Sequence, residues 1–419
     1  MKKRLLTILF AFAIAIPLSG QVYVQLTLNE YLERVRKNNI EYAAERLNME
    51  ISDAEIISAS VFNNPYISLG YYTNEFNNMQ MGQGAMVEIG KTISPGRRAA
   101  AINVAKSEKE LNEILLTDFM RKLRGNAVLT WLEAVKHRQI IEIRKNSYHD
   151  QIKMMVSDSI RREGNIVKDL DAMQSRVESG LLYSDIIDME LLLTQLYQEI
   201  SIYLGTGEKD TVYIPETKNI WNSKFFNLSE IIQTAITRRA DILAAKKEID
   251  VSKLSVVAAK KERIPEFDIF LGYGFNSEVK NELAPAPRHG GVEMGVSFPI
   301  PLFNRSKGEI QSAEVRRKQA ELRYIQAERE VTSEVINAYN EYMATDKKLK
   351  FLTAGIVRTA KEVLDEKRKD YNNGDIHLIE VLDAQRSYDE ILHSLYSVIY
   401  DKSMALVKLE TAMGVWNIE

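Results

Sequence analysis

Four short segments of the chain alternate apolar and polar residues with a period of two. They lie at about residues 64–74, 84–94, 266–276 and 290–300. The apolar positions of the third segment, for example, are Phe267, Ile269, Leu271, Tyr273 and Phe275. Polar residues and glycine fill most of the positions between them. A period of two is that of a β-strand with two different faces, so the pattern predicts four strands in two hairpins.

The two faces of these strands allow two interpretations. An apolar, aromatic-rich face opposite a polar and glycine face is typical of transmembrane β-strands, which have lipid on one side and water on the other. A half-buried sheet in a soluble protein shows the same alternation. If the strands lie in a membrane, the chain must oligomerise, because the smallest closed barrels have about eight strands and an open edge in lipid leaves backbone groups unpaired. Three copies would supply twelve strands.

Two long tracts contain no proline, at residues 96–214 and 302–419. Proline breaks helix interiors, so both tracts are free to form long helices. In the second tract a series of mostly apolar residues recurs every seven positions, with another series three positions further on. The first series is Leu378, Gln385, Leu392, Ile399, Leu406 and Met413, and the second is Val381, Tyr388, Leu395, Lys402 and Leu409. The sequence therefore predicts a coiled coil with two polar interruptions, Gln385 and Lys402.

A glycine divides each tract near its middle. Gly164 and Gly374 each stand beside asparagine or aspartate, a combination that is common where a helix ends and the chain turns. Each tract therefore predicts a hairpin of two helices, at about 96–204 and 304–414. One helix from Asn304 to Asn372 would be on the order of 100 Å long, at about 1.5 Å per residue.

The two halves of the chain have the same order of elements. Leu28-Asn29-Glu30 resembles Leu228-Ser229-Glu230, and Val87-Glu88-Ile89-Gly90 resembles Val292-Glu293-Met294-Gly295. Each half gives a helix, two strands, a very long helix and a returning helix, which indicates duplication of a whole module. The expected organisation is a signal peptide at 1–20, a first repeat at 21–214, a linker at 215–226 and a second repeat at 227–419.

The first twenty residues have the features of a secretory signal peptide. Three basic residues precede an apolar run from Leu5 to Ile16, and small residues follow. A short membrane anchor is the competing interpretation, although the run is too short to span a bilayer. No later stretch has the ~18 consecutive apolar residues of a membrane helix. A secreted protein of this kind is soluble in the periplasm, exported, or held in an outer membrane by β-strands.

Composition and charge exclude several classes of function. The chain of 419 residues is 45% hydrophobic and 27% charged, which is typical of an ordered protein. It has no cysteine, so disulfides, thiolate catalysis and a lipid anchor on an N-terminal cysteine are excluded. A net charge of −3 without a basic patch argues against a nucleic-acid partner. The five histidines are scattered without metal-ligand spacing, so we expect no catalytic residue, no metal site and no cofactor.

Together these features resemble the TolC-like outer-membrane efflux proteins, and in particular their heavy-metal and cation efflux branch. The resemblance extends from about Leu26 to Met413. Its marks besides the duplicated halves are Gly96-Arg97-Arg98, Pro299-Ile300-Pro301-Leu302-Phe303-Asn304-Arg305, Gly374-Asp375-Ile376 and Glu380-Val381-Leu382-Asp383-Ala384-Gln385. The chain departs from lipidated members of that branch, because it lacks the cysteine that they acylate.

The resemblance implies a fold class, a location and partners. The expected protein is a mainly helical homotrimer, with a twelve-stranded β-barrel in the outer membrane of a Gram-negative bacterium and a long α-helical barrel in the periplasm. It is the channel of a tripartite efflux system and passively conducts what an inner-membrane pump exports. The implied partners are outer-membrane lipid, a periplasmic adaptor (membrane fusion) protein, and an RND-type pump or an ABC exporter.

Four acidic residues are the candidates for a pore gate with cation selectivity. Glu380 and Asp383 lie three positions apart, hence on one helix face, directly after the Gly374 turn. The resemblance places such residues at the narrow periplasmic end, where threefold symmetry would stack them as rings of carboxylates. Asp169 and Asp171 are looser equivalents in the first half. The competing interpretation is that all four are ordinary solvated helix charges.

Two further pairs of residues complete the expected site. Gly164 and Gly374 would be the turns at the tip of the tunnel, and the resemblance adds that these turns dock the adaptor. Glu88 and Glu293 would face the barrel lumen and set a cation preference, or would be neutralised by salt bridges inside the barrel.

Two other functions remain open on the sequence. A TolC-like channel for protein secretion would have nearly the same pattern. A periplasmic coiled-coil protein without a pore would explain the helices and the signal peptide, but it would not explain two matched hairpins with an apolar outer face.

Overall fold

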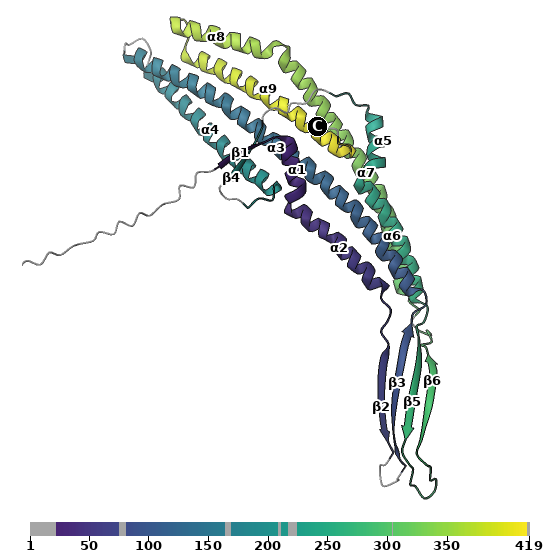
Figure 1. The fold of residues 1–419 in the computed structure, drawn as a ribbon. Helices are drawn as coiled ribbons and strands as arrows, with labels where there is room; N and C mark the ends of the chain where they lie inside the picture. Colours follow the sequence, from purple (N-terminus) through teal and green to yellow (C-terminus); the bar gives the residue numbers. More distant parts are fainter. Residues whose placement is uncertain are drawn as a thin grey trace, which may run out of the picture.

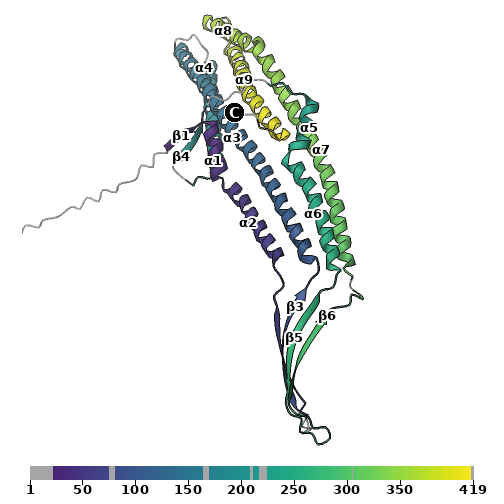
Figure 2. The same cartoon turned by 45° about the vertical axis from the view of Figure 1, so that its right-hand side comes forward.

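The computed structural model describes residues 22–74, 81–163, 169–207, 211–216, 224–303 and 305–416. The expected signal peptide, Gly164 and most of the expected linker lie outside these residues. The molecule is elongated: long strands form one end, and helices run from them to the opposite end (Figures 1 and 2).

The elements of the two halves follow the same order, except for two short strands in the first half and a break in the long helix of the second. The first half contains β1 (Val22–Leu26), α1 (Leu28–Asn38), α2 (Ile40–Ser60), β2 (Tyr66–Thr73), β3 (Gln83–Ile93), α3 (Arg97–Glu163), α4 (Asp169–Tyr203) and β4 (Thr211–Pro215). The second half contains α5 (Leu228–Arg238), α6 (Ala240–Glu262), β5 (Phe267–Asn276), β6 (His289–Ser297), α7 (Lys307–Phe351), a π-helical turn η2 (Leu352–Ile356), α8 (Val357–Asn373) and α9 (Leu378–Met413). The long strands therefore lie close to the four segments of period two.

The four long strands form one antiparallel sheet in the order β2-β3-β5-β6. The two hairpins meet through β3 and β5, so β2 and β6 are the free edges of the sheet within one chain. Leu271 pairs with Ile89 on one side and with Met294 on the other, and these three side chains are exposed on the same face. One face of the sheet is therefore apolar and uncovered within the chain.

Glycines and aromatic rings share the opposite face of the sheet. Gly90 pairs with Tyr66 on one side and with Phe270 on the other, and Phe270 also pairs with Gly295. A Cβ atom on Gly90 would clash with the Tyr66 ring, and one on Gly295 would clash with the Phe270 ring. Each aromatic ring thus lies over a glycine of the neighbouring strand. The ring covers the backbone that glycine, which has no side chain, leaves exposed.

A break divides the long helix of the second half. α3 is continuous over 67 residues, whereas α7 ends after 45 residues and passes through η2 into α8. Gly355 causes the break, because its φ of 126° and ψ of −9° lie outside the helical region. The prediction of one helix from Asn304 to Asn372 is therefore wrong. Glycine adopts such a conformation without the steric cost of a Cβ atom, so the absence of proline did not guarantee continuity.

Two short strands were not predicted. β1 and β4 pair in parallel, with Val22 opposite Thr211 and Leu26 opposite Pro215. Each has five residues, and the two are far apart in the sequence. Pro215, which the sequence suggested as part of a linker, instead ends β4, a position at which proline disrupts no ladder.

The core consists of two main clusters that meet at α9. The first contains Tyr31 stacked on Trp131, with ring centroids 4.8 Å apart. The second contains Tyr342 and residues of α5 and α6. α9 supplies Val407 to the first cluster and Leu406 to the second, so this helix joins the two halves.

Both polar interruptions of the heptad seam have partners. Lys402 lies 2.7 Å from the Asp346 carboxylate, which Lys350 also approaches to 2.7 Å. Lys350 and Lys402 lower the pKa of Asp346 to about 2. The Gln385 amide oxygen accepts a hydrogen bond from Arg368 at 2.6 Å. Polar residues in the seam are therefore compatible with packing because each is paired.

Across the described ranges, no helix is both long enough and apolar enough to cross a membrane.

Candidate functional site

The tip of the second half is a tight turn at Gly374. Its φ is 89°, in the left-handed region that glycine adopts without strain. The Gly374 N–H donates to the Tyr371 carbonyl at 3.1 Å, and the Asp375 N–H donates to the Asp370 carbonyl at 2.9 Å. These bonds satisfy the last carbonyls of α8, as the sequence around the glycine predicts. Its expected partner Gly164 lies outside the described residues.

The structure brings Glu380 and Asp383 together on the first turns of α9. Both line an open groove of about 480 Å³ beside α8. Glu380 is not a free carboxylate, because Lys367 of α8 donates to it at 2.5 Å and lowers its pKa. Asp383 lies 3.6 Å from Arg386 and is largely exposed. The groove therefore carries acidic groups with cations beside them, rather than bare negative charge.

Asp169 and Asp171 occupy the first turn of α4, where the helix N-terminus favours negative charge. Asp169 is exposed and lies 3.8 Å from Arg162. Within the described part of the chain, no hydrogen bond or ion pair joins these two residues to Glu380 or Asp383. The two acidic pairs are thus separate groups in a single copy.

Sequence reasoning missed a buried polar cluster near the tip. Asp158 of α3 is fully buried and accepts hydrogen bonds from Ser175 of α4 and, at 2.9 Å, from the Tyr371 hydroxyl of α8. Burial and the bond to Asp158 raise the pKa of Tyr371. Arg161 lies over the Tyr371 ring at 5.1 Å. The cluster ties α8 to the α3–α4 hairpin, and its only sequence signal was an acidic residue on an inward-facing position of a helix.

Glu88 and Glu293 share the glycine-bearing face of the sheet. Glu88 pairs with Gly272, and Gly272 pairs with Glu293, so a residue without a side chain separates the two carboxylates. Asp268 lies on the same face and accepts from Thr92 at 2.5 Å. This face is therefore acidic, whereas the face of Leu271 is apolar.

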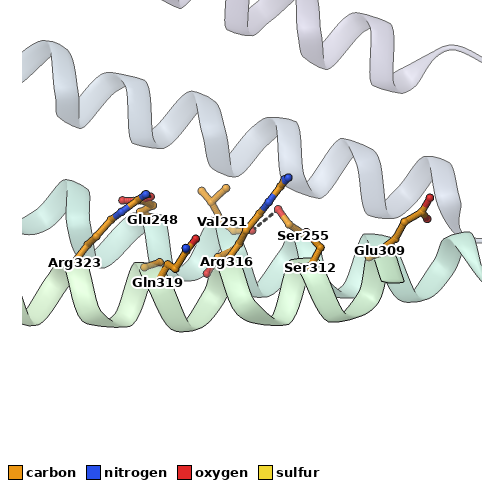
Figure 3. A pocket seen from close by; sticks show the side chains of 12 residues that line it. Glu248, Val251, Ser255, Glu309, Ser312, Arg316, Gln319 and Arg323 are labelled. Atoms are coloured by element: carbon orange, nitrogen blue, oxygen red, sulfur yellow. Dashed lines mark hydrogen bonds and ion pairs between the residues drawn. The ribbon is translucent and has the colours of Figure 1, made fainter. Parts of the chain in front are cut away.

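A second groove runs between α6 and α7 (Figure 3). It has a volume of about 560 Å³, and Glu248, Arg316 and Arg323 are among the residues that line it. Arg323 lies 2.7 Å from Glu248 across the groove. None of the expected site residues lines it. Among the described residues, no group of three or more His, Cys, Asp or Glu side chains could hold a metal ion.

Comparison with known proteins gives one family and several relatives. Residues 231–415 match the family described as outer membrane efflux protein. The cobalt-zinc-cadmium resistance protein CzcC of Cupriavidus metallidurans is 19% identical over 391 residues, which cover 93% of this chain and 90% of the relative. The cation efflux system protein CusC of Escherichia coli is 21% identical over 329 residues, 77% of this chain and 69% of the relative.

Solved structures of outer-membrane channels have the same fold. A crystal structure of CusC superposes with a TM-score of 0.77 at 17% identity, over 93% of this chain and 92% of the other. The CmeC outer membrane channel of Campylobacter jejuni superposes with a TM-score of 0.75 at 15% identity, over 92% of this chain and 85% of the other. The mainly helical chain with one long sheet therefore has the architecture of these channels.

Proposed function

Because this chain is a TolC-like outer membrane efflux protein, we propose that three copies assemble head to tail into one channel with a twelve-stranded barrel. The protein is an outer-membrane efflux channel with a helical tunnel in the periplasm. The observation that carries the proposed assembly is the sheet itself. Four strands with two free edges and an uncovered apolar face cannot stand alone in lipid, where each unpaired backbone group costs several kcal/mol.

The helices have matching free edges. α2 packs against α3 and exposes Ile40, Leu47 and Ile51 at heptad spacing, and Val61 directly after the helix is exposed as well. α7 packs against α6 and exposes Val315, Leu322 and Ile325. The helices lie side by side in the order α2-α3-α6-α7, and the strands in the order β2-β3-β5-β6. The free helix α2 is therefore on the same side of the chain as the free strand β2, and the free helix α7 is on the same side as β6. Such a chain forms a head-to-tail interface, which gives a closed ring when the rotation allows it.

The proposed assembly predicts a trimer in detergent. Light scattering, with the detergent mass subtracted, should give three times the mass of the mature chain. Lysine at both Leu47 and Ile51 should shift the protein to monomers, because the charges would be buried between α2 and the neighbouring α7. Lysine at Glu45, which is exposed and off the seam, is the matched control and should leave the trimer intact. A wild-type monomer would overturn the proposal.

The gate is proposed at the Gly374 tip. Each of Glu380 and Asp383 would form a ring of three carboxylates in the trimer. Like charges about 6 Å apart repel by on the order of 1–3 kcal/mol at dielectric constants of 80 to 20. Lys367 reduces this repulsion within each copy, and a divalent cation would reduce it across the pore. The buried Asp158–Tyr371 contact would hold α8 in the closed position.

Neutralising the rings should change ion selectivity. Glu380→Gln with Asp383→Asn should lower the cation preference and weaken block by divalent ions in planar-bilayer recordings. The control is Glu362→Gln with Asp365→Asn on α8, which also removes an exposed ion pair, that of Glu362 with Arg358 at 3.2 Å. Unchanged selectivity and unchanged block in the first variant would show that these residues are not the gate.

The exported substrate is proposed to be a cation. The named functions of the CzcC and CusC relatives support this, together with Glu88 and Glu293 on the face that would line the lumen. We propose that a periplasmic adaptor docks at the tips around Gly374 and Gly164, and that the inner-membrane pump is of the RND type or an ABC exporter.

A further inference from the structure

Two arginines hold together the junction between sheet and helices within one chain. Arg97, at the start of α3, donates to the Glu262 and Ile264 carbonyls at the end of α6, at 2.9 Å each. Arg98 donates to the Ser60 carbonyl at the end of α2 at 2.6 Å. Guanidinium groups at helix C-termini satisfy carbonyls that have no partner in the helix. α3 is therefore fixed to both neighbouring helices where the sheet begins.

The start of α7 does not have two arginines at the corresponding positions. Gly96, with a φ of 74°, precedes α3, and Ser306, with a φ of 52°, precedes α7 in the same left-handed conformation. The residues that follow are Arg97 and Arg98 in the first half and Lys307 and Gly308 in the second. Near the sheet α7 contacts α6, for example through Glu314 and Lys260, and it packs against α5 and α9 farther along, from Val331 to Asp346. In the proposed ring, the other neighbour of α7 near the sheet would be α2 of the next copy.

A longer apolar segment takes the place of the arginine pair. Residues 298–306 connect β6 to α7, whereas residues 94–96 connect β3 to α3. The longer connection contains Phe298, Ile300, Leu302 and Phe303, all exposed, and Phe303 is 99% exposed. The segment lies at the edge of the molecule beside β6 (Figures 1 and 2). Within one chain, this side of the junction is therefore apolar and uncovered.

The opposite edge of the same junction offers an aromatic platform. Val61 and Phe62 connect α2 to β2 and are exposed, Phe62 by 63%. The Arg98 guanidinium lies 3.9 Å from the Phe62 ring centroid, and the Lys91 ammonium lies 5.2 Å from it. These cation–π contacts hold the ring in place while most of its surface stays open.

We propose that residues 298–303 of one copy pack on Val61 and Phe62 of the next copy. This rests on the head-to-tail assembly proposed above. The duplicated halves indicate what covers this segment. In the first half, the equivalent connection before α3 contacts the junction of α6 and β5, where Ser94 donates to Glu266 at 2.5 Å and Arg97 caps α6. The connection before α7 would meet the junction of α2 and β2 in the next copy in the same way. An apolar contact would thus join copies where polar contacts join the two halves of one chain.

Cysteine cross-linking tests this contact directly, since the chain has no cysteine of its own. Phe62→Cys with Phe303→Cys in one full-length chain, treated in outer-membrane vesicles with a short bismaleimide, should give covalent dimers and trimers on denaturing gels. Each single variant should stay monomeric on the gel. Val61→Cys with Phe303→Cys is a second pair that keeps the Phe62 ring. The control is Phe62→Cys with Leu283→Cys, because Leu283 is 96% exposed but lies in the loop between β5 and β6.

The outcomes separate this contact from the assembly as a whole. A protein that has the mass of a trimer but cross-links through neither pair would overturn the contact and leave the assembly intact. A spin label attached at position 303 gives a second test. If lipid-soluble oxygen reaches the label and an aqueous quencher does not, the segment faces lipid and the proposed contact is wrong. A protein that is monomeric by mass would overturn the assembly itself.

Discussion

Replacing Leu271 with arginine is expected to prevent the protein from assembling in the outer membrane. Leu271 is 50% exposed and lies between Ile89 and Met294 on the apolar face of the sheet. It is near the middle of β5, so its side chain would be near mid-depth in lipid. A cation there costs about 2–4 kcal/mol per chain, and the cost arises in every copy of the ring. Membrane fractionation and the yield of trimer in detergent would measure the effect.

The matched control places the same residue on the other face. Met86 pairs with Gly70 and with Gly274, so an arginine at Met86 has room and would face the water-filled lumen. Met86→Arg should leave the yield of trimer close to that of the wild type. Equal loss of both variants would show that the sheet does not have one lipid face and one aqueous face.

Replacing Arg239 with alanine is expected to destabilise the fold by about 3 kcal/mol, near the lower end of the 3–5 kcal/mol for a broken buried ion pair. Arg239 is 2% exposed and donates to the Ala412 carbonyl at the end of α9 at 2.9 Å. It also lies 2.6 Å from Asp241 and 2.8 Å from Glu334. Alanine would leave the Ala412 carbonyl and Asp241 without this partner. Urea unfolding followed by far-UV circular dichroism would measure the loss.

The repeat supplies the control for Arg239. Asn39 is the equivalent residue between α1 and α2, and its amide donates to the Tyr203 carbonyl near the end of α4 at 3.1 Å. Asn39→Ala removes neutral hydrogen bonds and an N-cap and should cost about 1 kcal/mol. If Arg239→Ala were no more harmful than Asn39→Ala, the ion pairs would contribute nothing beyond a helix cap.

The same ion pair gives the Arg239 prediction a pH dependence. Burial raises the pKa of Asp241, but the Arg239 guanidinium outweighs burial, so the pKa lies below its ordinary value. A lowered pKa contributes stability above the unfolded value of about 3.9, and that stability is lost as pH falls through the folded value. The difference between wild type and Arg239→Ala should therefore be full at neutral pH and shrink in acid.

Local patterns determined the elements of this fold. A period of two places β2, β3, β5 and β6, because alternation is a property of a few neighbouring residues. The tip turn at Gly374 follows from its asparagine and aspartate neighbours. Glu380 and Asp383 share a face because they are three residues apart on one helix. The family resemblance rests on short segments of the same local kind.

Only the tertiary structure decided how distant residues meet. The pairing of β3 with β5 determines which sheet edges are free, and the ladder of β1 and β4 joins strands almost two hundred residues apart. The Asp158–Tyr371 contact and the Lys367–Glu380 pair each join different helices, and the break at Gly355 interrupts a tract whose spacing is helical. Periodicity reports which face of an element is buried, but not which other element covers that face. The covering element is chosen by the packing of the whole chain, and for α2, α7 and the outer strands it is proposed to be a second copy.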